Sequence, residues 1–124
     1  MAPFTHWVRD WLARSHRARE IESLSDRDVR ELGIDRNTLR ELASHPADVP
    51  ERMSRMARVF GVDPAAIHRQ RGRGFDMTMT CGLCRDRKAC ARELFGDAPS
   101  SPERCGFCPN AAAFRNLAAE RAAA

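Results

Sequence analysis

The sequence predicts an all-α protein of two small helical modules, the second stapled by a cysteine-ligated metal centre. Three observations lead to this prediction. Apolar residues recur at helical spacing through most of the 124-residue chain. The segment "SHPADVP", with two prolines, interrupts the helical pattern near residue 46. All five cysteines lie beyond residue 80. We therefore expect a helical module over residues 1–45, a linker over 46–50 and a Cys-rich helical module over 51–124.

The composition is that of a folded, water-soluble protein. Hydrophobic residues make up 43% of the chain and charged residues 31%, which argues against disorder. No apolar run is long enough for a transmembrane helix, and the first fifteen residues lack the apolar core of a secretory signal. We therefore expect a cytoplasmic protein without a membrane partner. Disulfides are rare in the cytoplasm, so clustered cysteines there favour a metal or catalytic site.

The net charge of +4 suits a polyanionic partner such as RNA. Its distribution weakens that inference, because no segment is a dense basic tail and the only locally basic run is "HRQRGRG", residues 68–74. Lys88 is the only lysine. So much arginine is explained by a GC-rich genome as readily as by a nucleic-acid partner.

The first predicted element is an amphipathic helix over roughly residues 5–23, followed by two short helices. Ser25 and Asp28 have the spacing of a capping box, which predicts a helix start there. Gly33 marks the end of that helix, and Asp35 can cap a third helix over "RNTLRELA". The long helix is indicated by apolar residues on one face: Trp7, Val8, Trp11, Leu12, Ala18, Ile21 and Leu24.

Residues 19–42, "REIESLSDRDVRELGIDRNTLREL", resemble the YjiS-like family, the domain of unknown function numbered 1127. The resemblance implies a small bacterial protein with an RNA-linked regulatory role. The alternative to RNA contact is that the arginines of the first helix simply form its solvent-exposed face, since acidic residues share that helix. The candidate nucleic-acid residues are Arg14, Arg17 and Arg19 together with Arg69, Arg71 and Arg73.

The second module is predicted to begin with a helix whose first residue is Pro50 and which Gly61 ends. Asp63 then starts a short helix, and "RGRGFDMTM", residues 71–79, is expected to be turn-rich. Another helix is expected over residues 87–95, capped by Asp86, and a last one from about Asn110. The predicted core residues are Met53, Met56, Phe60, Ile67, Leu83, Leu94, Phe95, Phe107, Phe114 and Leu117.

The cysteine spacing allows two sets of four metal ligands. Cys81, Cys84, Cys105 and Cys108 have the spacing of a structural zinc site and leave Cys90 spare. Cys81, Cys84, Cys90 and Cys108 leave Cys105 spare instead. Their Cys-x2-Cys-x5-Cys triple resembles that of WhiB-like regulators and iron–sulfur DNA glycosylases, and Cys108-Pro109 resembles the Cys-Pro of bacterial ferredoxins.

Residues 52–119 resemble a second bacterial family of unknown function, numbered 6455. The resemblance is carried by "RMSRMARVFGVD", "CGLCRDRKACARELF" and "FCPNAAAFRNL". It implies cysteines at the positions of Cys81, Cys84, Cys90 and Cys108, and it leaves Cys105 outside the pattern. The family implies no activity, so the metal is left open between a [4Fe–4S] cluster and zinc.

No catalytic arrangement is evident, because the sequence has no Ser–His–Asp order, no paired carboxylates in an apolar setting and no phosphate-binding glycine loop. We therefore expect a non-enzymatic protein without a small-molecule substrate. The favoured hypothesis is a cytoplasmic bacterial regulator or sensor with a [4Fe–4S] cluster, whose N-terminal module contacts RNA or a protein. The alternative is a zinc-stabilised adaptor without a redox role.

Overall fold

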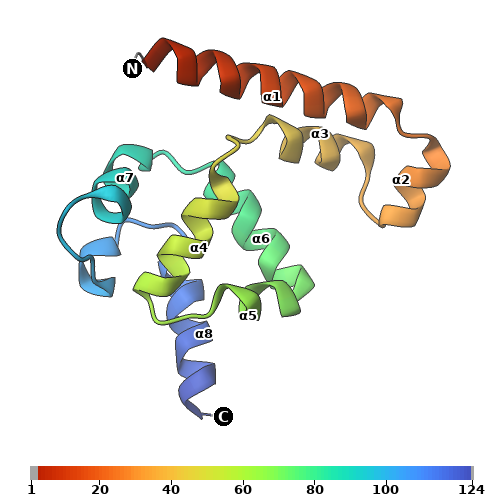
Figure 1. Ribbon diagram of the computed structural model, residues 1–124. Coiled ribbons are helices and arrows are strands. Elements are labelled where there is room, and N and C mark those ends of the chain that lie inside the picture. The colour runs from red at the N-terminus through yellow and green to blue at the C-terminus, as the bar shows by residue number, and fades with distance from the viewer. Residues whose placement is uncertain (1–2, 124) are drawn as a thin grey trace. The chain divides into compact units, whose positions relative to one another are not determined.

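The computed structural model describes residues 3–123, with the side chains of residues 8, 9 and 11–123. Over this range the protein is all-helical, without a β-strand (Figure 1). None of the described helices is long and apolar enough to cross a membrane. The chain divides into two compact units, Met1–Ala47 and Asp48–Ala124, which we call unit 1 and unit 2. The predicted all-α class is confirmed; the side chain of Trp7 lies outside the described residues.

Unit 1 is a long helix followed by two short ones, as the capping signals predicted. The Ser25 hydroxyl accepts a hydrogen bond from the Asp28 N–H at 3.1 Å, and the Asp28 carboxylate accepts one from the Ser25 N–H at 3.3 Å. Gly33 has a φ of 71°, the left-handed conformation that ends a helix. Asp35 accepts a hydrogen bond from the Thr38 N–H at 2.9 Å. The helices are α1 (Pro3–Ser23), α2 (Asp26–Leu32) and α3 (Arg36–Ser44).

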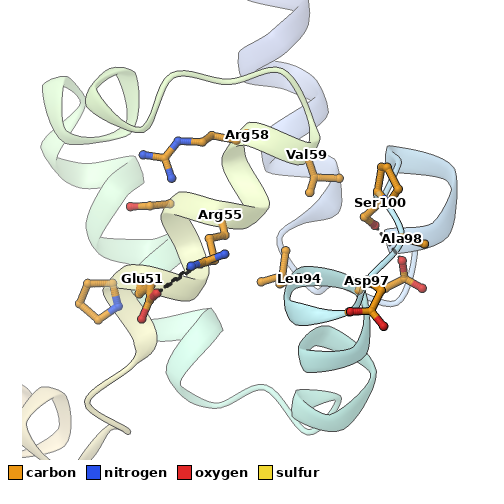
Figure 2. A pocket seen from close by; sticks show the side chains of 13 residues that line it. Glu51, Arg55, Arg58, Val59, Leu94, Asp97, Ala98 and Ser100 are labelled. Atoms are coloured by element: carbon orange, nitrogen blue, oxygen red, sulfur yellow. Dashed lines mark hydrogen bonds and ion pairs between the residues drawn. The ribbon is translucent and has the colours of Figure 1, made fainter.

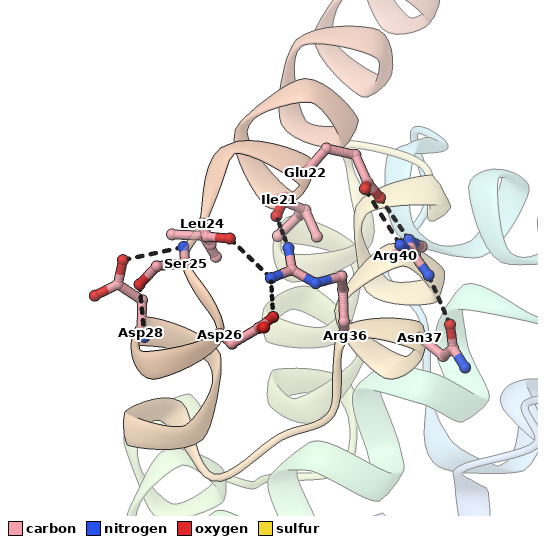
Figure 3. A network of polar contacts seen from close by, with 9 residues as sticks. All are labelled: Ile21, Glu22, Leu24, Ser25, Asp26, Asp28, Arg36, Asn37 and Arg40. Carbon is pink, nitrogen blue, oxygen red and sulfur yellow. Dashed lines mark hydrogen bonds and ion pairs between the residues drawn. The ribbon is translucent and has the colours of Figure 1, made fainter.

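The end of α1 is held by an arginine from α3 (Figure 3). The Arg36 guanidinium donates hydrogen bonds to the carbonyl oxygens of Ile21 and Leu24, both at 2.7 Å, and to the Asp26 carboxylate at 3.3 Å. The last carbonyls of a helix have no partner within it, so a cation there satisfies orphan acceptors and opposes the helix dipole. Arg36 therefore ties all three helices of unit 1 together.

Replacing Arg36 by alanine should loosen unit 1. Hydrogen bonds from a charged donor each contribute about 1.5–3 kcal/mol, so we expect amide exchange at the end of α1 and in α3 to accelerate by about tenfold or more. Hydrogen exchange of the full chain, read by mass spectrometry, measures this directly. Arg40→Ala is the control, because Arg40 pairs with Glu22 at an exposed site and such pairs contribute little. Equal exchange in the two variants would contradict the assigned role.

Unit 2 is built around α4, whose apolar stripe supplies much of its core. Met53, Met56, Ala57 and Phe60 are all buried, as their spacing predicted. The Phe60 ring stacks on that of Phe114 from the last helix, with 5.4 Å between centroids. The elements of unit 2 are α4 (Val49–Val59), α5 (Pro64–Arg69), α6 (Arg71–Gly82), α7 (Arg87–Phe95), the 3-10 helix η1 (Pro102–Cys105) and α8 (Ala111–Ala123) (Figure 1).

The turn predicted over residues 71–79 is wrong, because these residues form most of α6. Gly74 lies where α6 passes close to α5. A Cβ at Gly74 would lie 2.9 Å from the Ile67 carbonyl oxygen, so the glycine lets α6 pass close to α5. Burial of Met77 against the core then stabilises a helix whose local sequence does not favour one.

Two residues expected in the core are on the surface. Leu83 is 63% exposed and Phe95 is 48% exposed. Phe95 is covered on one face by the Arg55 guanidinium, 4.5 Å from its ring centroid, a cation–π contact that its sequence neighbours did not reveal. The start of α4 also differs slightly, since Val49 is its first residue and Pro50 its second.

Candidate metal centre

Four of the five cysteines line one cavity in unit 2. Cys81 lies in the last turn of α6, and Cys84 follows in the connection to α7. Cys90 lies near the start of α7, and Cys108 precedes α8. The remaining wall is mainly apolar and includes Met53, Met56, Phe107 and Phe114. Four potential ligands from distinct elements thus face one enclosed space.

One of these sulfurs accepts a hydrogen bond, and two others lie near N–H groups. The Asp86 N–H donates to Cys84 Sγ at 3.3 Å. The Asn110 N–H near Cys108 and the Arg52 guanidinium near Cys90 each act to lower the pKa of the neighbouring thiol. N–H donors favour a thiolate over a thiol, and donors of this kind commonly surround metal-bound sulfur. These N–H groups therefore offset part of the cost of placing anionic sulfur in the cavity, but burial outweighs them.

The same site opposes ionisation of its thiols when no cation is present. Burial, followed by the neighbouring Cys108, Cys90 and Cys84, raises the pKa of Cys81 to about 11. Burial also raises the pKa of Cys108 to about 11, against the opposing hydrogen bond from Asn110. Like charges in a low-dielectric setting repel, so the thiolates become compatible only with positive charge among them.

Cys105 occupies a different environment. It is fully buried and belongs to the apolar core of unit 2. Its sulfur lies 3.3 Å from the Ser100 hydroxyl, and it does not line the cavity of the other four. The structure thus brings together Cys81, Cys84, Cys90 and Cys108, with Cys105 packed outside that group.

The thiols surround the cavity without converging on one point. Among the described residues, no three His, Cys, Asp or Glu side chains are grouped as ligands of a single metal ion would be. A tetrahedral zinc site needs every sulfur about 2.3 Å from the ion, which places neighbouring sulfurs roughly 3.8 Å apart. A closed zinc site would therefore require the four thiols to be drawn together around the ion.

Behind the cysteines lies a charged network that the sequence patterns did not reveal. Asp48 accepts hydrogen bonds from Arg52 Nε and from Arg87 Nη2, each at 2.7 Å. Burial alone would raise the pKa of the Asp48 carboxyl, but the two guanidinium groups outweigh it and lower that pKa. In the sequence, only the four-residue spacing of Asp48 and Arg52 indicated that these two side chains could pair on a helix.

The arginines proposed for nucleic-acid contact are divided between the two units, three in each. Arg17 in unit 1 donates to the carbonyl oxygens of Ala43 and His45 at 3.3 and 3.1 Å, so it helps hold α3 against α1. Arg73 in unit 2 makes two 3.0 Å hydrogen bonds to Glu120. Arg14 is partly buried, whereas Arg19, Arg69 and Arg71 are exposed. RNA binding stays a prediction.

A second, larger pocket of about 880 Å³ lies between α4 and the segment after α7 (Figure 2). Glu51 pairs with Arg55 across one side, and Asp97 and Ser100 lie on the other. Val59 and Leu94 supply apolar lining. Its charges are mixed in sign, and none of the five cysteines lines it.

Comparison with known proteins gives one result. A profile described as "Family of unknown function (DUF6455)" matches residues 36–120. The match begins in α3, crosses the boundary between the two units and ends in α8. It confirms the resemblance predicted for residues 52–119, while that of residues 19–42 to the YjiS-like family stays a prediction. No curated protein and no solved structure matches the sequence.

Proposed function

The chain belongs to the family of unknown function DUF6455, and we propose that it is a small regulatory or sensor protein that binds a [4Fe–4S] cluster. Its ligands are Cys81, Cys84, Cys90 and Cys108. One observation carries the proposal. These four thiols come from separate segments to line one apolar-walled cavity.

The sequence spacing of the cysteines supports a cluster over a single zinc ion, because the Cys-x2-Cys-x5-Cys triple and Cys108-Pro109 resemble those of iron–sulfur proteins. In a [4Fe–4S] centre each cysteine binds a different iron, so the four sulfurs lie farther apart than around one ion. The cavity itself holds about 30 Å³. A cluster would therefore enter with rotation of the thiols about their Cα–Cβ bonds, which the partial exposure of all four cysteines allows.

The residues around the centre connect its state to the packing of unit 2. The cluster, when bound, supplies one-electron redox chemistry and sensitivity to oxygen. Asn110 is next but one to Cys108, and its side-chain amide donates to the Met77 carbonyl oxygen at 2.8 Å in the core. Asn110 thus joins the start of α8 to α6, so a shift at Cys108 would alter the contact between these helices. This packing change is the proposed signal.

Metal analysis of the anaerobically purified full chain tests the proposal. We expect a brown protein with about four iron and four sulfide ions per chain, as four cysteine ligands imply. Exposure to air should bleach the visible absorption and change the near-ultraviolet circular dichroism of unit 2. A colourless protein with one zinc per chain would overturn the proposal in favour of the zinc-stabilised adaptor.

A further inference from the structure

Two arginines are fixed beside the cysteine cavity by one carboxylate. Besides its bond to Asp48, Arg52 donates from Nη1 to the Arg87 carbonyl oxygen at 3.1 Å. Only 11% of the Arg52 side chain is exposed, against 32% for Arg87. A surface ion pair is mobile and contributes little to stability. Here the hydrogen bonds to Asp48 and to the Arg87 carbonyl oxygen join the start of α4 to that of α7, so the Arg52 side chain has few other conformations open to it. Its positive charge is therefore held in place.

Both guanidinium groups act on the cysteine site. Arg52 is part of the cavity wall that all four of these cysteines share. Arg87 is joined to Arg52 through Asp48, which accepts from both, and through its own carbonyl oxygen, which accepts from Arg52. In addition, Arg87 Nη1 is buried and has no hydrogen-bond partner in the protein. Burying an N–H donor without an acceptor is energetically unfavourable. An anion would supply the hydrogen-bond acceptor that no protein atom provides for this nitrogen.

The two arginines would interact electrostatically with the net charge of the proposed centre. Four thiolates around a 2+ core leave a net charge of about −2. One electron taken up from a one-electron reductant would make it one unit more negative, with all four iron–cysteine bonds kept. Net charge and hydrogen bonds to the sulfurs are among the main determinants of cluster potential.

Resting on the proposed function, we infer that Arg52 and Arg87, fixed by Asp48, are positioning residues that favour the more negatively charged, reduced state of the centre. Arg52 contributes more, because it combines deeper burial with a place in the cavity wall. The network thus sets the potential at which the sensor responds.

The test compares Arg52→Gln with Arg58→Gln in the full chain. Arg58 lies on the same helix but is exposed and borders the other pocket (Figure 2). Each anaerobic protein is titrated with dithionite and followed by visible absorption and electron paramagnetic resonance. At the wild-type midpoint, the ratio of reduced to oxidised cluster should fall about tenfold in Arg52→Gln, equivalent to about 59 mV. Arg58→Gln should stay within twofold of wild type.

Arg52→Lys and Arg87→Gln separate charge from structure. Lysine keeps the positive charge, so its midpoint should lie between those of Arg52→Gln and wild type. A purely structural role would lower cluster content in both Arg52 variants without moving the midpoint of the loaded protein, and that result would overturn the inference. If Arg52→Gln holds no cluster, the Arg87→Gln variant decides the question. Its midpoint potential should be lower than that of the wild type, and an unchanged midpoint potential would overturn the inference.

Failure of the proposed function gives a different result. If the wild type contains zinc instead of iron, the cluster and its potential are both overturned. The charge-balancing role is then tested by the rate of zinc transfer to a chromogenic chelator. That rate should be at least tenfold faster in Arg52→Gln than in Arg58→Gln. Equal rates would overturn the role of the arginines for a metal of either kind.

Discussion

Replacing Cys90 by serine should abolish the metal centre and destabilise unit 2. Cys90 lines the shared cavity together with Arg52, so its loss would remove one of the four proposed ligands. Metal binding contributes on the order of 10 kcal/mol to small structural sites, far more than the apolar core of a unit this size supplies. We expect cluster content below about a tenth of wild type, measured as iron per chain after anaerobic purification.

Cys105→Ser is the matched control for that experiment. Cys105 is buried in the core beside Ser100 and outside the cavity, so its replacement should keep the full metal content. The hydroxyl is accommodated next to Ser100, and we expect a modest loss of stability of about 1–3 kcal/mol for a buried polar group. The ligand assignment would be reversed if the Cys105→Ser protein lacked metal and the Cys90→Ser protein were fully loaded.

Replacing Phe114 by alanine should unfold metal-free unit 2. Only 1% of Phe114 is exposed, and its ring stacks on Phe60, the pair that joins α8 to the end of α4. Truncating a buried phenylalanine costs about 3–5 kcal/mol. Domains of this length gain roughly 3–5 kcal/mol from their core, so little stability would remain. Thermal unfolding with a chelator present, followed by circular dichroism at 222 nm, measures the loss.

Leu83→Ala provides the comparison for Phe114→Ala. Leu83 is also a large apolar residue of unit 2, but 63% of it is exposed. Surface substitutions usually change stability by less than about 0.5 kcal/mol, so its melting temperature should match wild type. A loss in Leu83→Ala as large as that in Phe114→Ala would show that the core of unit 2 differs from the one described.

Local signals made unit 1 predictable. The capping box of Ser25 and Asp28, the left-handed Gly33 and the cap at Asp35 each depend on residues within three positions of one another. The contribution of Arg36 could not be predicted, because it reaches carbonyl groups 12 and 15 residues earlier in the chain. That contact exists only once α1 and α3 have packed.

Unit 2 was harder to predict because tertiary contacts override its local sequence. Gly72 and Gly74 suggested a turn. In the structure both belong to α6, and the missing side chain of Gly74 leaves room for α6 to pass close to α5. Cysteine spacing narrowed the ligands to two sets, but spacing does not reveal that Cys105 packs into the core. The Asp48, Arg52 and Arg87 network spans 39 residues and carried no motif at all.

The order of the cysteines has a consequence for the denatured ensemble. Cys81, Cys84 and Cys90 lie within ten consecutive residues, so an unfolded chain still presents three thiols that can chelate metal at little cost in loop entropy. Metal bound by unfolded molecules offsets part of the stabilisation that the native site would otherwise gain. Cys108 is the ligand whose participation depends on chain closure over 18 positions. In the proposed site, the preference of metal for the folded protein would therefore reside chiefly in Cys108, whereas the first three cysteines would govern how readily metal is captured before folding is complete.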